Sequence, residues 1–224
     1  MKIIYLGQAG FLFETKGMKI MVDPYLSDSV EKVEPHNRRR VPVEKRWLEV
    51  KPDVLIFTHN HLDHYDPETA DKIITPTSGI TVLAPASVYY EVRKRGGNNL
   101  YILFDRHTQW SQGDIRFSAV KAVHSDPAAI GVIIDAEGKK YYITGDTLYN
   151  EDIFSDIPED IYALFLPVNG VGNNMNMQDA SRFAQRICAE RTVPIHVGMF
   201  DSLHGEDFVC NGKVIPEIYK EIEL

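Results

Sequence analysis

The chain has 224 residues, of which 44% are hydrophobic and 25% charged, and its formal net charge is −8. This length fits one folded domain, residues 1–224. The negative charge argues against nonspecific binding to nucleic acid or to an anionic membrane surface, since both depend on Lys and Arg. No run approaches the roughly 20 apolar residues that a membrane span needs, and the two cysteines are too few for a disulfide framework. We therefore expect a cytoplasmic protein without a nucleic-acid or membrane partner.

The N-terminal quarter predicts a meander of strands followed by a charged loop. Short β-rich runs at residues 2–6, 11–14 and 19–22 are separated by glycines. Asp23, which precedes a proline, is a typical turn former. The segment 27–46 has no periodicity and is rich in charge, which is typical of a solvated loop.

The next stretch has the chemistry of a metal site. The apolar run 54–57 is followed by His59, His61, Asp63 and His64. In an extended chain alternate side chains share one face, so the first three can point the same way while His64 follows as the chain turns. Neutral imidazole and carboxylate hold zinc, iron or manganese. A helix is then expected with Asp66 as its N-cap.

The remaining elements alternate between strands and helices. Further residues of the kinds that bind metals come at the ends of predicted strands. His124 ends the strand 115–124, Asp146 follows the hairpin 131–144, and His196 directly follows the strand 192–195. Other strands are predicted at 81–84, 100–104 and 161–166, helices at 86–95 and 178–190, and a loop rich in Asn and Gly at 167–177. Residues 213–224 give no clear assignment.

Taken in order, these motifs resemble those of the metallo-β-lactamase superfamily. The resemblance implies a four-layer αββα sandwich, whereas periodicity alone gives only α/β or α+β. It also implies that His59, His61 and His124 hold one metal ion. Asp63, His64 and His196 then hold a second ion, with Asp146 between the two. Asp23 gains a second interpretation here, as a support for the ligands.

The resemblance implies metal-assisted hydrolysis. Two divalent ions bring more positive charge than Asp63 and Asp146 neutralise, so the site favours an anionic substrate and a metal-bridging hydroxide as nucleophile. Asp63 and Asp146 are the expected catalytic residues. We expect Zn²⁺, with Mn²⁺ as the alternative, because imidazole-rich sites accept either. The absence of a Gly-x-Ser-x-Gly motif argues against a serine nucleophile.

The substrate is less well determined. Within the superfamily, Asn60 and Leu62 between the ligands, the Tyr65-Asp66 that follows them and the short chain length are most similar to the branch of ascorbate 6-phosphate lactonase. This similarity implies opening of a lactone or ester of a small anionic substrate. The alternatives are a phosphodiesterase or phospholipase D-like hydrolase, and a metal-binding module without catalysis. Arg38, Arg39 and Arg40 are candidates for contacts to a substrate phosphate, and Asn169, in the loop 167–177, is a candidate for the pocket wall. Relatives often associate, which allows a homo-oligomer. The other histidines, His36, His107 and His204, are expected at the surface or in packing.

Overall fold

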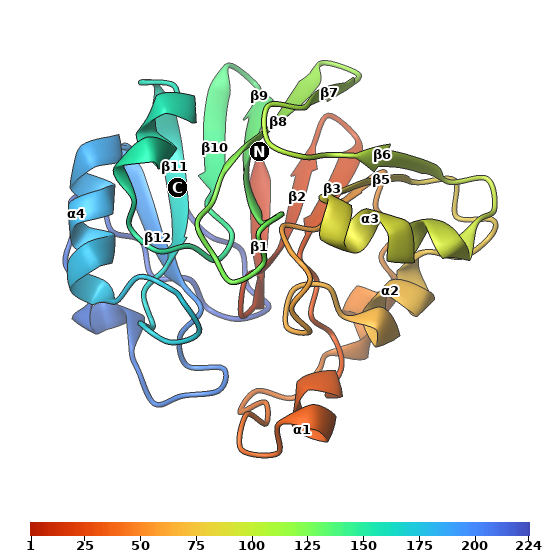
Figure 1. Cartoon of the computed structure of the whole chain (residues 1–224), viewed down its shortest axis with the longest axis horizontal. Coiled ribbons are helices and arrows are strands. Elements are labelled where there is room, and N and C mark those ends of the chain that lie inside the picture. The colour runs from red at the N-terminus through yellow and green to blue at the C-terminus, as the bar shows by residue number, and fades with distance from the viewer.

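The computed structural model describes residues 1–224 and consists of two six-stranded sheets with helices on their outer faces (Figure 1). The first sheet is ordered β1-β2-β3-β4-β5-β6. Its strands are β1 (Lys2–Gly7), β2 (Gly10–Thr15), β3 (Met18–Val22), β4 (Val54–Ile56), β5 (Thr81–Ala84) and β6 (Leu100–Leu103). The second sheet is ordered β12-β11-β10-β9-β8-β7. Its strands are β7 (Gln109–Gln112), β8 (Ile115–Lys121), β9 (Ile130–Ala136), β10 (Lys139–Ile143), β11 (Ile161–Pro167) and β12 (Arg191–Ile195).

The helices form the two outer layers. α2 (Pro67–Ile73) and α3 (Ala86–Val92) cover the first sheet, and α4 (Met177–Ile187) covers the second (Figure 1). α1 (Ser29–Val33) lies apart from these layers, beyond one edge of the sheets (Figure 1). The predicted four-layer αββα arrangement is therefore confirmed. No helix is both long enough and apolar enough to cross a membrane.

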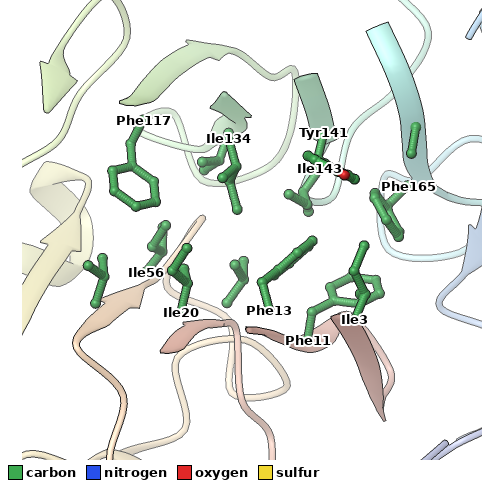
Figure 2. Packing of buried hydrophobic residues seen from close by; sticks show 14 of the residues in the cluster. Ile3, Phe11, Phe13, Ile20, Ile56, Phe117, Ile134, Tyr141, Ile143 and Phe165 are labelled. Atoms are coloured by element: carbon green, nitrogen blue, oxygen red, sulfur yellow. The ribbon is translucent and has the colours of Figure 1, made fainter. Parts of the chain in front are cut away.

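The largest apolar cluster lies between the sheets (Figure 2). Phe11 and Phe13 of β2 point toward the second sheet, where their rings lie 4.9 and 5.9 Å from the ring of Phe165 in β11. Leu12, between them in sequence, belongs to the cluster under α2 and α3 instead. This alternation buries both faces of the strand.

Strand direction sets the place of the functional residues. β3, β4, β5 and β6 run parallel to one another, and so do β10, β11 and β12. Because parallel strands end on the same side of a sheet, the loops after β4, β10 and β12 can meet at one edge of the molecule.

Most predicted elements are present, with differences at short ones. The hairpin around Glu137 and Gly138 is confirmed, with φ of 55° and 74° at these two residues. Asp66 caps α2 as predicted, accepting hydrogen bonds from two backbone amides of its first turn. The predicted loop 27–46 contains α1, and β7 has no counterpart in the prediction. Residues 213–224 form no regular element, although Glu221 makes an isolated bridge with Ile4.

Candidate metal centre

Each predicted ligand lies just beyond the carboxyl end of a strand. His59 follows β4, His124 follows β8, Asp146 follows β10, and His196 directly follows β12. His196 takes a positive φ of 62°, and its backbone N–H donates to the carbonyl of Gln8 at 2.9 Å. The four segments therefore converge although the ligands are far apart in the sequence.

The loop between β4 and α2 contains a tight turn. The backbone N–H groups of His64 and Tyr65 both donate to the carbonyl of His61, at 3.0 and 2.8 Å. The turn reverses the chain between His61 and His64, so that the two imidazoles belong to different donor groups.

The first donor group contains His59, His61, His124 and Asp146, whose ligand atoms all lie within 4.8 Å of one another. The His124 Nε2 atom is 3.1 Å from His61 Nδ1 and 4.0 Å from Asp146 Oδ2. The rings of His59 and His124 are 4.7 Å apart between centroids. Three imidazoles and a carboxylate thus face one point.

The second donor group contains Asp63, His64 and His196. The His196 Nε2 atom lies 3.1 Å from Asp63 Oδ2 and 3.2 Å from Asp146 Oδ2. The His64 Nε2 atom lies 3.2 Å from Asp146 Oδ1. Asp146 therefore touches both groups, which is the position that the sequence resemblance gave it.

Three buried polar atoms at this centre make no hydrogen bond of acceptable geometry: His59 Nε2, His64 Nε2 and Asp146 Oδ1, although the last two lie 3.2 Å apart. An unpaired buried donor or acceptor is costly, and each such atom requires an explanation. Neutral imidazole and carboxylate atoms of this kind are ligands for zinc or manganese. The residues present therefore fit divalent metal ions held by these donor groups.

The charged groups of the centre shift one another's pKa values. Burial, together with nearby His64, lowers the pKa of His59 well below its ordinary value, which leaves a neutral imidazole. Burial would also lower the pKa of His196, but Asp146 and Asp63 outweigh it and raise that pKa to about 10. Burial would raise the pKa of Asp63, yet His64 and His196 hold it below its ordinary value. Metal ions must displace the protons that these imidazoles hold, so binding releases protons.

Asp23 supports His64 from behind. Its Oδ2 atom is 2.8 Å from His64 Nδ1, and its carboxylate also accepts from the Thr58 backbone N–H at 2.8 Å and the Thr58 hydroxyl at 2.5 Å. A proton on Nδ1 leaves Nε2 free to act as a ligand. Of the two interpretations of Asp23, these contacts favour the supporting one, although the residue also occupies a turn with φ of 41°.

Gln8 and Asn174 contact the centre and were missed from the sequence. The Gln8 side-chain amide donates to Asp63 Oδ2 at 2.8 Å and lies 3.0 Å from His196 Nε2. The Asn174 amide donates to Asp146 Oδ2 at 2.8 Å. The only signal for Gln8 was its place in a glycine-bounded turn, and the only signal for Asn174 was its place in the loop 167–177.

A cavity of about 590 Å³ opens beside the second donor group. Asn169 is among its lining residues, with its Nδ2 atom 3.0 Å from His196 Nδ1. The complete lining is Gln8, Val30, Val33, Glu34, Asn37, Asn60, His61, Leu62, Asp63, Asp146, Asn169, Val171, Gly172, Asn174, His196, Phe200 and Asp201. It contains no Lys or Arg.

The predicted arginine contacts are not found at this cavity. The Arg39 guanidinium donates to the carbonyls of Tyr25 and Val41 and to the Tyr219 hydroxyl, so it fastens the segment to the protein. Arg38 and Arg40 are exposed and do not line the cavity. The physical reason is that the chain before them forms α1, which places Val30, Val33 and Glu34 at the opening instead.

The remaining histidines lie outside the centre. His36, His107 and His204 are exposed, as expected for surface residues. His107 has a partner, since its Nε2 atom is 3.2 Å from Asp156 Oδ1.

Comparison with known proteins places the chain in a family. A family model described as Beta-lactamase superfamily domain matches residues 18–197. The chain is 30% identical over 244 residues to a UPF0173 metal-dependent hydrolase of Thermoplasma acidophilum, with 100% of this chain and 99% of that protein covered.

Solved structures share the fold. Igni18, a metallo hydrolase from Ignicoccus hospitalis, has a TM-score of 0.78 and 19% identity, covering 98% of this chain and 96% of that one. An isothiocyanate hydrolase from Delia radicum gut bacteria has a TM-score of 0.72 and 19% identity, covering 100% and 99%. By the family model and the sequence relative, the chain belongs to the β-lactamase superfamily domain family and, within it, to the UPF0173 metal-dependent hydrolases.

Proposed function

We propose that this hydrolase opens a carboxylic ester or lactone with the help of two divalent ions, Zn²⁺ or Mn²⁺. The observation that supports this most directly is the pair of donor groups that share Asp146 and adjoin one cavity. The resemblance to the ascorbate 6-phosphate lactonase branch points to the same chemistry. When bound, such ions lower the pKa of a water molecule and polarise a carbonyl oxygen.

The side chains of the chain itself have separate roles in this proposal. Asp63 lines the cavity and has one carboxylate oxygen within hydrogen-bond reach of Gln8 and His196, so it is placed to orient the attacking water and to pass its proton on. Asn169 also lines the cavity and can donate from its amide to a substrate oxygen. Asn174, whose amide contacts Asp146, holds that carboxylate in place between the donor groups.

The cavity lining favours the ester over the phosphodiester alternative. A phosphodiester keeps a full negative charge at neutral pH, and proteins bind such groups mainly with Arg and Lys. This lining has neither, and it adds the carboxylates of Glu34 and Asp201 to those of Asp63 and Asp146. Attraction for the predicted anionic substrate therefore depends on the metal ions alone.

The test is turnover by purified protein that has been stripped with chelator and reloaded separately with zinc and with manganese. The panel contains lactones, carboxylic esters, phosphodiesters and an isothiocyanate. We expect hydrolysis of esters or lactones, lost in His59→Ala and in Asp146→Asn. His204→Ala, which removes an exposed histidine outside the centre, is the matched control and should retain full activity.

The outcomes separate the alternatives. Cleavage of phosphodiesters alone would replace the ester proposal with the phosphodiesterase one. Metal bound at both donor groups without turnover of any ester or lactone would contradict the proposal and favour the metal-binding module.

A further inference from the structure

Five apolar residues line the cavity, although the centre beside it is ionic. Val33 and Val171 are 67% and 66% exposed, and both line this cavity. They come from separate segments, α1 and the loop after β11. Val30, Leu62 and Phe200 are the other apolar residues of the lining. Single exposed apolar residues are ordinary, but several that meet at one opening mark a binding surface.

These apolar side chains are held in place. The segment after α1 is fastened by the Arg40 backbone N–H, which donates to the carbonyl of Met199 at 2.9 Å. The ring of Tyr25 packs edge-on against that of Phe200 at 5.8 Å. On the other side the Gly170 N–H donates to the Met175 carbonyl at 3.0 Å, which closes the loop that has Val171 near its tip. The surface is therefore present before a ligand arrives.

The polar groups around this surface do not attract an anion. Glu34 is bonded to the Asn37 amide at 2.6 Å, and Asp201 accepts from the backbone N–H groups of Gly198 and Leu203, both at 2.9 Å. Without Lys or Arg in the lining, a phosphate placed here would face carboxylates. The opening suits an uncharged group.

We propose that Val30, Val33, Val171 and Phe200 bind an uncharged alkyl or aryl group of the substrate. This inference rests on the proposed ester or lactone hydrolysis and names its substrate class: esters or lactones with an apolar group of several carbons, not phosphorylated ones. The reacting carbonyl lies at the metal centre and the apolar group extends to the opening. Each methylene that this surface removes from water should strengthen binding about fourfold.

The test measures binding without turnover. Straight-chain carboxylates from acetate to octanoate, which are products of ester hydrolysis, are titrated by calorimetry into the zinc-loaded protein. We expect affinity to rise by about fourfold per methylene over the middle of the series. In the double variant Val33→Ser, Val171→Ser, octanoate should bind about tenfold more weakly while acetate changes less than about twofold. Serine is uncharged, so it does not repel the carboxylate of the probe.

Val209→Ser is the matched control, because Val209 is 75% exposed and lies outside the cavity. Equal affinity for all chain lengths, or equal losses in the control and the double variant, would overturn the inference. A chain-length effect that depends on Val33 and Val171 supports the surface even if no ester is turned over, in which case only the proposed function fails. Tighter binding of a short phosphorylated lactone than of an uncharged lactone with an eight-carbon chain would also contradict the inference.

Discussion

Gln8 contacts the metal centre while its backbone takes a strained conformation. It has a φ of 55°, a region that β-carbon-bearing residues occupy with strain, and it is only 2% exposed. Its amide donates to Asp63, while its carbonyl accepts from the backbone N–H of His196. Strain of this kind is characteristic of functional sites, where the surrounding structure enforces it.

Replacing Gln8 by glycine should separate function from stability. Gly adopts this φ freely, so Gln8→Gly should fold normally, whereas loss of the amide should weaken metal affinity or activity about 10- to 100-fold. Metal affinity is measured by competition with a chromophoric chelator. Gln185→Ala, at an exposed position of α4, is the control and should bind metal like the unmodified protein. Unchanged affinity and turnover in Gln8→Gly would show that the amide is dispensable.

Among single residues, the sequence predicted the metal ligands that lie close together in the chain, but not the residues whose contacts with them span many positions. His59, His61, Asp63 and His64 fall within six positions, so their residue types alone indicated a metal site. The contacts of Gln8 with Asp63 and His196 span 55 and 188 positions. No local pattern reports such contacts, since they exist only after the strands have paired.

Among the elements, α1 and β7 escaped prediction. α1 has five residues, too few to show a helical period, and β7 has the sequence Gln-Trp-Ser-Gln, without the apolar run that indicated the equally short β5. The 3₁₀ helix Glu151–Asp156 was also missed, yet it ends on a residue that joins several segments. Asp156 accepts from Arg106 Nε at 2.7 Å and from the backbone N–H of Lys121 at 2.9 Å.

Asp156→Asn should reduce stability in a pH-dependent way. The Arg106 guanidinium outweighs the effect of burial and holds the pKa of Asp156 below its ordinary value. A depressed pKa in the folded state contributes stability above the unfolded value of about 4, and that stability is lost as pH falls toward the folded value. At neutral pH the variant should therefore lose about 1–3 kcal/mol of unfolding free energy.

Urea unfolding at a series of pH values measures this effect. The difference between Asp156→Asn and the unmodified protein should shrink as the pH falls below about 4. Asp160→Asn, which removes a surface partner of Lys140, is the control and should leave the midpoint unchanged. A constant difference at all pH values would argue against the charged contact as its source.

The end of α4 offers a stabilising change. Cys188 closes this helix in the left-handed conformation, with φ of 56° and ψ of 38°, and its N–H donates to the Ala184 carbonyl. Glycine is preferred at this position because it has no β-carbon. Cys188→Gly should therefore raise the free energy of unfolding by about 0.5–1 kcal/mol. Cys188→Ala keeps a β-carbon and should give no gain, so equal gains in both variants would contradict this explanation.

For the whole molecule, the sequence pattern alone predicted only a mixture of strands and helices, without their arrangement. Pairing of the two sheets depends on contacts such as that of Phe11 with Phe165, which lie far apart in the chain. The four-layer arrangement was predicted only because the order of the metal motifs resembled a known superfamily. The expectation of one domain over residues 1–224 and the expectation of a homo-oligomer both stay predictions.

The separation of core and site predicts how the molecule responds to metal removal. The main apolar cluster lies between the sheets, whereas both donor groups lie beyond the carboxyl ends of strands. Chelation should therefore leave the far-ultraviolet circular dichroism unchanged. A ligand that binds only the folded state adds about 2.7 kcal/mol of unfolding free energy at a free concentration 100 times its Kd, so each bound ion should contribute this amount.

Thermal unfolding with increasing free zinc measures that contribution. Asp146→Asn, at the residue that touches both donor groups, should lose most of the zinc-dependent rise in Tm, measured from the midpoint of its own chelated form. His204→Ala should show the full rise. A chelated protein that has lost its sheet signal would instead mean that the metal ions hold the two sheets together. An Asp146→Asn variant with an undiminished rise would mean that the ions are bound without that carboxylate.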